Sequence, residues 1–177
     1  MALPDPRNLT PRQRLAAGIA GAVVAVAGVF TGVQEGTIFH SYPDPVLGWG
    51  KATACTGHTG PEIHPGQTFT AEDCASMQAA DLKTTYLGIL PCIGDVPMPD
   101  RELEAWLSFA FNVGPAAFCK SSIPAKLKAG DHAGACATLS LYRFVGGRDC
   151  AMPQYQHVCG GVVRRRAAER SLCEGRT

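Results

Sequence analysis

Two carboxylates near the N-terminus form a pair of the type that can cleave a glycosidic bond. Glu35 directly follows a long apolar segment, Asp44 lies within SYPDPV, and Thr53 begins TACTGHTG. Such chemistry needs a carboxylic acid to protonate the leaving oxygen and a second carboxylate to hold water or stabilise a developing cation. We expect the apolar surroundings to raise the pKa of Glu35, and a polar hairpin to keep Asp44 ionised.

The elements around these residues are predicted from composition and periodicity. Residues 40–60 are rich in Gly, Pro and Thr and predict a short β-hairpin or small sheet. Thr70-Ala-Glu-Asp73 resembles a capping box that starts a helix running to about Leu90. Shorter helices are expected at about 122–129, 132–144 and 160–173. The predicted fold class is therefore α+β, mostly helical, with one early β element.

Residues 101–113 predict a further helix with a wide apolar face, which Gly114 ends. The residues of this face are Leu103, Trp106, Leu107, Phe109 and Ala110. We interpret Trp106 and the nearby phenylalanines as core.

Length and composition indicate one globular domain. With 46% hydrophobic and 18% charged residues among 177, the chain is unlike a disordered one, and a net charge of +1 gives no support for nucleic-acid binding. We expect a monomer without a cofactor. From Cys159 to the C-terminus the sequence has five arginines and only two acidic residues, Glu169 and Glu174, which gives a local net charge of +3. The default interpretation is a solvated helix face. These arginines are Arg164, Arg165, Arg166, Arg170 and Arg176.

The eight cysteines predict a disulfide-bonded body. They are Cys55, Cys74, Cys92, Cys119, Cys136, Cys150, Cys159 and Cys173. No Cys-x-x-Cys pair occurs, so zinc is poorly supported and no metal site is expected. An oxidising compartment, here the periplasm, explains so many thiols in so short a body. Eight cysteines allow 105 pairings, and only Cys150–Cys159 is proposed on local grounds.

Residues 15–33, LAAGIAGAVVAVAGVFTGV, form a nineteen-residue uncharged segment. As a helix it would span ~28 Å, close to the hydrocarbon thickness of a bilayer. Arg7, Arg12 and Arg14 precede it, so the positive-inside rule keeps residues 1–14 in the cytoplasm and exports the rest.

The segment is a weak membrane anchor, because six of its residues are Ala and four are Gly. It could be a permanent anchor, or a signal peptide cleaved after Ala25-Val26-Ala27. The favoured interpretation is an anchor that inserts, arrests and later leaves the membrane. The predicted organisation is a basic N-terminus (1–14), this segment (15–33) and a catalytic domain (34–177).

Several blocks in one order resemble the phage lysozymes of glycoside hydrolase family 24. They are Glu-Gly (35–36), Tyr-x-Asp-Pro (42–45), Thr-x-Cys-x-Gly-His-Thr-Gly (53–60), FNVGPAAF (111–118), KLKAGDHAGAC (126–136) and GGVVRRRAAERSLC (160–173). The resemblance covers roughly residues 34–175. It implies a lysozyme-like fold with a helical lobe, and hydrolysis of the β-1,4 bond between N-acetylmuramic acid and N-acetylglucosamine in peptidoglycan.

The family's catalytic residues fall on Glu35, Asp44 and Thr53. The resemblance implies that Glu35 is the general acid, that Asp44 positions the attacking water or stabilises the cation, and that Thr53 holds that water. It also implies a C-terminal arginine near the Glu, one of Arg164–Arg166.

One departure concerns the threonine, since eight residues (45–52) separate it from Asp44, more than is usual in the family. We interpret this as a longer hairpin carrying Trp49, with Thr56 and Thr59 as alternatives to Thr53. Satisfying backbone groups in a turn is the ordinary role for all three hydroxyls. His58 is interpreted as a hydrogen-bonded structural residue, and sugar stacking by Trp49 is a secondary hypothesis.

The apolar segment resembles the signal-arrest-release (SAR) segments of some phage endolysins. The expected partners are then the peptidoglycan glycan strand and, through residues 15–33, the host inner membrane. A helix held in lipid would keep Glu35 away from Asp44, so we expect the tethered form to be inactive and the released, periplasmic form to be active. Residues 1–54 contain no cysteine, which excludes thiol exchange from within the segment.

Two other functions are considered. A lytic transglycosylase needs the Glu but no water-holding pair, so Asp44 and Thr53 disfavour it. A non-catalytic periplasmic peptidoglycan-binding protein would instead use the basic C-terminal residues to bind the wall.

Overall fold

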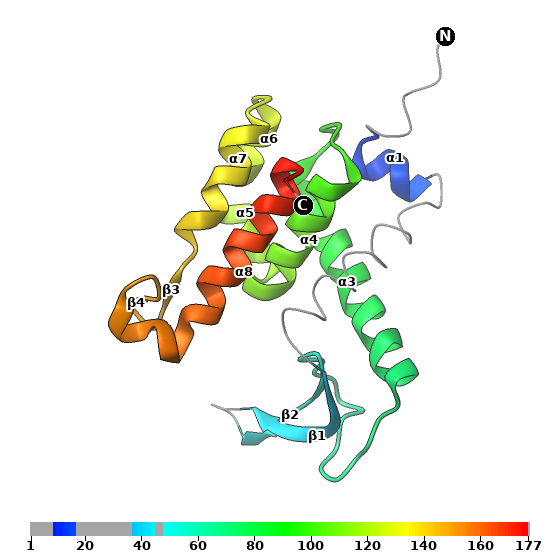
Figure 1. The fold of residues 1–177 in the computed structure, drawn as a ribbon. Helices are drawn as coiled ribbons and strands as arrows, with labels where there is room; N and C mark the ends of the chain where they lie inside the picture. The colour runs from blue at the N-terminus through cyan, green and yellow to red at the C-terminus, as the bar shows by residue number, and fades with distance from the viewer. Residues whose placement is uncertain (1–8, 17–36, 45–47, 177) are drawn as a thin grey trace.

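The computed structural model describes residues 9–16, 37–44 and 48–176. Its elements are α1 (Pro11–Ala16), β1 (Ile38–Asp44), β2 (Gly48–Cys55), α3 (Ala71–Ile93), α4 (Asp100–Val113), α5 (Pro115–Lys120), α6 (Ile123–Lys128), α7 (His132–Thr138), η2 (Leu139–Leu141), β3 (Phe144–Val145), β4 (Arg148–Asp149), η3 (Pro153–Tyr155) and α8 (Gln156–Glu174). Figure 1 shows the β1–β2 hairpin at one end and α3 leading from it to a lobe in which α8 lies along α4. The predicted fold class, mostly helical with a small early hairpin, is confirmed.

The predicted hairpin is present, and its register shifts twice, between Ile38 and Tyr42 and, at a bulge, between Pro43 and Asp44. The strands are antiparallel, with Tyr42 opposite Thr53 and Pro43 opposite Ala52. The next pair is Asp44 with Gly48, so one step along β1 corresponds to four steps along β2, a difference of three residues. Residues 49–51 form this bulge in β2, and it explains the long spacing between Asp44 and Thr53.

A small core and a disulfide fix the hairpin to the start of α3. The buried residues of this core are Ala52, Ala54, Cys55, Ile63 and Cys74. The Cys55–Cys74 bond connects the last residue of β2 with the first turn of α3, across 5.2 Å between Cα atoms. The position of the hairpin therefore depends on α3.

Helix α3 begins as predicted. The hydroxyl of Thr70 accepts from the backbone N–H of Asp73, and the Asp73 carboxylate accepts from the backbone N–H of Thr70, which completes a capping box. The helix continues one turn past the predicted Leu90 and ends at Gly94, whose φ of 73° favours glycine.

Helix α4 is the centre of the lobe. All five predicted apolar residues are buried, and Trp106 and Phe109 have no exposed surface. Its neighbours are α3, α5 and α8, which surround the helix. Gly114 ends it with a φ of 88°, as predicted.

The C-terminal third differs from expectation in one place. The helices expected near 122–129 and 160–173 are present as α6 and α8, although α8 starts earlier and has a kink at Cys159. The prediction of a helix over 132–144 is wrong for its last residues, since α7 ends at Thr138 and is followed by the short η2 turn. Gly146 and Gly147, with φ of 54° and 76°, instead form the turn of a β3–β4 hairpin, because consecutive positive φ values suit a tight hairpin and not a helix.

All eight cysteines are paired. The predicted Cys150–Cys159 bond is present, and the other pairs are Cys55–Cys74, Cys92–Cys119 and Cys136–Cys173. The three longer loops close 19, 27 and 37 residues. In the chain-entropy model each contributes roughly 3–4 kcal/mol to stability.

Most of the predicted membrane segment, including Ala25–Ala27, lies outside the described residues. Among the helices that the structure does describe, none is long and apolar enough to cross a bilayer. Residues 9–16, at the border of the predicted cytoplasmic and membrane parts, are described and lie against the helical lobe.

Candidate active site

The hairpin carries two of the three predicted catalytic residues, and Glu35 lies outside the described residues. Asp44 ends β1, and Thr53 lies two residues before the end of β2. Because side chains alternate between faces along a strand, Tyr42 and Asp44 share a face, and Thr53 lies opposite Tyr42. Asp44 and Thr53 therefore lie on one face of the hairpin, with Tyr42 beside both.

The charge of Asp44 acts on this shared face. Burial raises the pKa of Tyr42, and the negative charge of Asp44 raises it further. Such an effect requires the carboxylate to be close to the phenol, in agreement with the register.

The three candidate threonines differ in their surroundings. Thr53 and Thr56 are each 6% exposed, whereas Thr59 is exposed. The Thr53 hydroxyl is 3.5 Å from the Lys51 carbonyl oxygen, a long contact that holds it weakly. The Thr56 hydroxyl is buried without a hydrogen bond within the described part of the chain. Both buried hydroxyls therefore have capacity for a water molecule.

The bulge in β2 borders a cavity of about 390 Å³. Its lining residues are Trp49, Gly50, Lys51, Ala52, Thr59, Gly60, Pro61 and Ile63. Trp49 is 48% exposed, as expected for a residue of the longer hairpin. The bulge thus presents an aromatic ring and a lysine beside the hairpin without changing the Tyr42–Thr53 pairing.

A second cavity, of about 400 Å³, lies where the loop after the hairpin meets the helical lobe. It is lined by Thr56, Gly57, Thr59, Asp81, Thr84, Thr85, Phe111, Asn112 and Pro115. The residues come from the loop after β2, from α3, and from the junction of α4 and α5. This cavity is therefore a cleft between the two parts of the fold.

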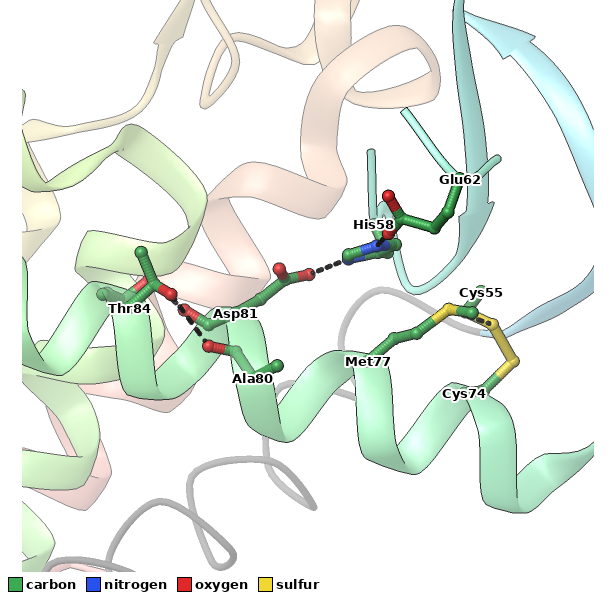
Figure 2. A network of polar contacts seen from close by, with 9 residues as sticks. Cys55, His58, Glu62, Cys74, Met77, Ala80, Asp81 and Thr84 are labelled. Atoms are coloured by element: carbon green, nitrogen blue, oxygen red, sulfur yellow. Dashed lines mark hydrogen bonds and ion pairs between the residues drawn. A yellow bond between two sulfur atoms is a disulfide. The ribbon is translucent and has the colours of Figure 1, made fainter. Parts of the chain in front are cut away.

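His58, in the loop that follows β2, connects this loop to α3 at the edge of the cleft. Figure 2 shows its ring between Asp81 and Glu62, with Nδ1 2.8 Å from an Asp81 oxygen and Nε2 2.7 Å from a Glu62 oxygen. Burial alone lowers the pKa of His58, but the hydrogen bonds to Glu62 and Asp81 outweigh it, and the net pKa is raised. The prediction of a hydrogen-bonded structural histidine is confirmed.

A buried group of charges lies between α4 and α8. Arg165 and Arg166 both contact Glu169, with Nε–Oε distances of 3.1 and 3.0 Å, and Ser108 donates to the same carboxylate at 2.7 Å. The Arg166 guanidinium also lies 4.8 Å from the centre of the Phe109 ring. Burial raises the pKa of Glu169 and lowers that of Arg166 to about 10, while the opposite charges act against both shifts.

The default interpretation of the C-terminal arginines as a solvated face is wrong for two of them. Arg165 and Arg166 are buried, because α8 packs this side on α4, whereas Arg164 is exposed. Arg166 donates to the side-chain oxygen of Asn112 at 2.9 Å. Asn112 borders the cleft and also a third cavity, of about 390 Å³, which Arg165 lines.

Asn112, Asp81 and Glu169 were not singled out from the sequence. Glu169 stands three and four residues after its arginine partners, a spacing that indicates ion pairs on one helix. Nothing local distinguishes Asn112 or Asp81, whose importance arises from contacts across the fold. Within residues 9–16, 37–44 and 48–176 no group of three or more His, Cys, Asp or Glu could hold a metal ion.

Comparison with known proteins agrees with this architecture. Residues 33–169 match a family model described as phage lysozyme. The SAR-endolysin of bacteriophage PS119 is 35% identical over 168 residues, which cover 92% of this chain and 93% of the relative. The SAR-endolysin of Enterobacteria phage P21 is 34% identical, with coverages of 92% and 94%.

Among solved structures, the active form of P1 phage endolysin Lyz aligns over 98% of both chains, with a TM-score of 0.66 and 21% identity. The part of the chain that the structure describes therefore shares the fold of this endolysin. Since the family model spans most of the sequence and the relatives cover nearly all of it, the predicted resemblance is confirmed, and this chain belongs to the phage lysozyme family of glycoside hydrolases.

Proposed function

We propose that this chain is an endolysin that hydrolyses the β-1,4 bond between N-acetylmuramic acid and N-acetylglucosamine, with Glu35, Asp44 and Thr53 as its catalytic residues. The main support is the hairpin register, in which Asp44 and Thr53 share a face despite the three-residue bulge between them. Membership of the phage lysozyme family supports the reaction class.

In this proposal the three residues divide the reaction between them. Glu35 gives its proton to the glycosidic oxygen as the bond to the anomeric carbon breaks. The Asp44 carboxylate positions the attacking water or stabilises positive charge on the sugar, and the Thr53 hydroxyl holds that water. One proton leaves Glu35 and one is released from the water, so the reaction balances.

For the arginine near the acid we propose Arg165. Arg164 is exposed, and both Arg165 and Arg166 pair with Glu169, but only Arg166 is also held by Asn112 and the Phe109 ring. Arg165 lines the cavity beside Asn112, where its charge would orient a nearby carboxylate.

The first experiment compares wild type with Glu35→Gln on purified peptidoglycan. Loss of the general acid is expected to lower kcat by roughly 10²–10⁴-fold. Unchanged hydrolysis would overturn the assignment, and binding without any cleavage by wild type would favour a non-catalytic wall-binding protein. The released sugar ends separate the remaining alternative, since anhydro-muramic acid would mean a lytic transglycosylase.

We also propose that residues 15–33 first hold the chain in the host inner membrane, with the N-terminus in the cytoplasm, and that release into the periplasm activates it. The support is that relatives covering most of the chain are SAR-endolysins, and that only Gln34 separates this segment from Glu35. Insertion of the segment in lipid and assembly of the site would then exclude each other.

A further inference from the structure

Helix α1 and the two residues before it are docked on the helical lobe, beside α3 and the start of α4 (Figure 1). The side chain of Arg14 is fully buried, with 0% exposed surface. Its guanidinium donates to the carbonyl oxygen of Met98 at 2.6 Å, to Asp100 Oδ1 at 2.7 Å, and to the carbonyl oxygen of Leu9. A charged side chain is thus enclosed by acceptors.

The lobe also holds the backbone of this segment. The Tyr86 hydroxyl donates to the Pro11 carbonyl oxygen at 2.6 Å, and the Met98 N–H donates to the Leu9 carbonyl oxygen at 3.4 Å. Glu104, 8% exposed, adds a second carboxylate close enough to interact with Arg14. We call this surface the α3–α4 socket, formed by Tyr86, Met98, Asp100 and Glu104.

The contacts of Arg14 differ in kind from those of its neighbour Arg12. A guanidinium removed from water is tolerated only where its donors are paired and its charge is opposed. Arg12, on the same helix, has a 59% exposed side chain, and its ion-pair partner Asp95, 3.7 Å away, is exposed as well. Of the two arginines of α1, Arg14 is therefore the one that is buried and paired with the lobe.

The same arginine directly precedes the apolar segment. If residues 15–33 span the membrane with the N-terminus inside, Arg14 lies at the cytoplasmic surface and the socket lies on the opposite side, ~28 Å away or more. Arg14 cannot occupy the socket in that state. The two locations of this residue exclude each other.

We propose that the α3–α4 socket is a binding site for residues 9–16 that is filled only after the chain leaves the membrane, and that Arg14 locks the released form. The inference rests on the proposed membrane stage and is independent of the catalytic assignments. In the socket, hydrogen bonds and the charge of Asp100 replace the hydration that Arg14 loses on leaving water. The docked segment therefore opposes its own reinsertion into the membrane.

The test uses the full chain in cells, in a Glu35→Gln background so that lysis does not interfere, with membrane and soluble fractions measured over time. Arg14→Gln and Asp100→Asn each break the lock, the second without changing the charge of the N-terminus. Arg12→Gln is the matched control, because it removes the same charge from the same helix at an exposed site. We expect the ratio of released to tethered protein to fall at least about tenfold in the two lock variants and to stay near wild type in the control.

Thermal unfolding of the purified released proteins provides a second readout. The midpoint should fall by about 5 °C or more for Arg14→Gln and Asp100→Asn, and hardly at all for Arg12→Gln. Equal behaviour of Arg14→Gln and Arg12→Gln in both measurements would overturn the proposal, as would a chain that never enters the membrane fraction. Persistent lysis in the Glu35→Gln background would overturn the catalytic assignment and leave the socket untouched.

Discussion

Two equally buried threonines, Thr53 and Thr56, lie three residues apart at the edge of the proposed site. Thr53 faces the same side of the hairpin as Asp44, whereas Thr56 lines the cleft between the hairpin and the helical lobe. Thr53→Val is expected to lower kcat on peptidoglycan by about 10²-fold or more, because the attacking water loses its hydrogen-bond partner.

Thr56→Val is the matched control, since it deletes the same hydroxyl at the same exposure. Its kcat should stay within a few-fold of wild type. If Thr56→Val were inactive and Thr53→Val active, the catalytic threonine would be Thr56 and not Thr53.

The contacts of His58 with Glu62 and Asp81 make stability dependent on pH. The pKa of His58 is raised in the folded state, above ~6.5 in the unfolded chain. The folded state therefore holds the proton to higher pH, and this contribution is complete below pH ~6.5 and lost as pH rises through the folded pKa. The unfolding midpoint should fall between pH 6 and pH 9 by more in wild type than in Asp81→Asn.

Glu62 provides the comparison on the other side of the ring. Its side chain is 56% exposed, so the pair with His58 is screened by solvent and Glu62→Gln should change the pH profile less than Asp81→Asn. Identical pH profiles for wild type and Asp81→Asn would show that the contact of His58 with Asp81 does not contribute to the pH dependence of stability.

At the scale of elements, the α4–α8 interface depends on a buried carboxylate between two arginines. Glu169→Gln would leave the charges of Arg165 and Arg166 without their shared opposite charge, and we expect the free energy of unfolding to fall by about 3–5 kcal/mol. Glu174→Gln, which breaks the partly exposed pair with Arg170 on the same helix, should cost about 0–1 kcal/mol. Chemical denaturation measures both, and equal losses would contradict the assignment of the cluster as a core interaction.

The bulge of β2 has its own expected effect on substrate. Trp49, half exposed beside a cavity, can stack on a sugar ring, so Trp49→Ala should raise KM by roughly 3–10-fold with little change in kcat. Phe144→Ala, which removes an exposed aromatic ring from β3, is the control and should leave KM unchanged. A fall in kcat for Trp49→Ala would mean that the bulge supports the catalytic face instead.

At the scale of the whole molecule, membrane residence and catalysis are expected to exclude each other. Replacing Gly18, Gly21 and Gly28 with Leu makes residues 15–33 a stronger membrane segment, because each Leu favours insertion. The variant should stay in the membrane fraction with little muramidase activity. Full activity from the membrane-bound protein would contradict the release hypothesis, and a matched set of Gly→Ala changes controls for the loss of glycine itself.

The features that the sequence alone determined are local or repetitive. The capping box at Thr70, the apolar face around Trp106, the turn-rich hairpin and the short Cys150–Cys159 loop each depend on residues within a few turns of one another. The family, too, was evident from ordered blocks of sequence. The helix expected to reach residue 144 was too long because the Gly146-Gly147 turn outweighs helical periodicity there.

Only the tertiary structure decided which distant surfaces meet. It paired cysteines 19 to 37 residues apart, buried Arg165 and Arg166 against Glu169, and showed that the bulge absorbs the extra residues between Asp44 and Thr53. It also joined Arg14 to Asp100, 86 residues away, where a basic residue had been expected only to set membrane orientation. The reason is physical: propensity and periodicity act along the chain, whereas burial of a charge depends on partners that folding brings from elsewhere.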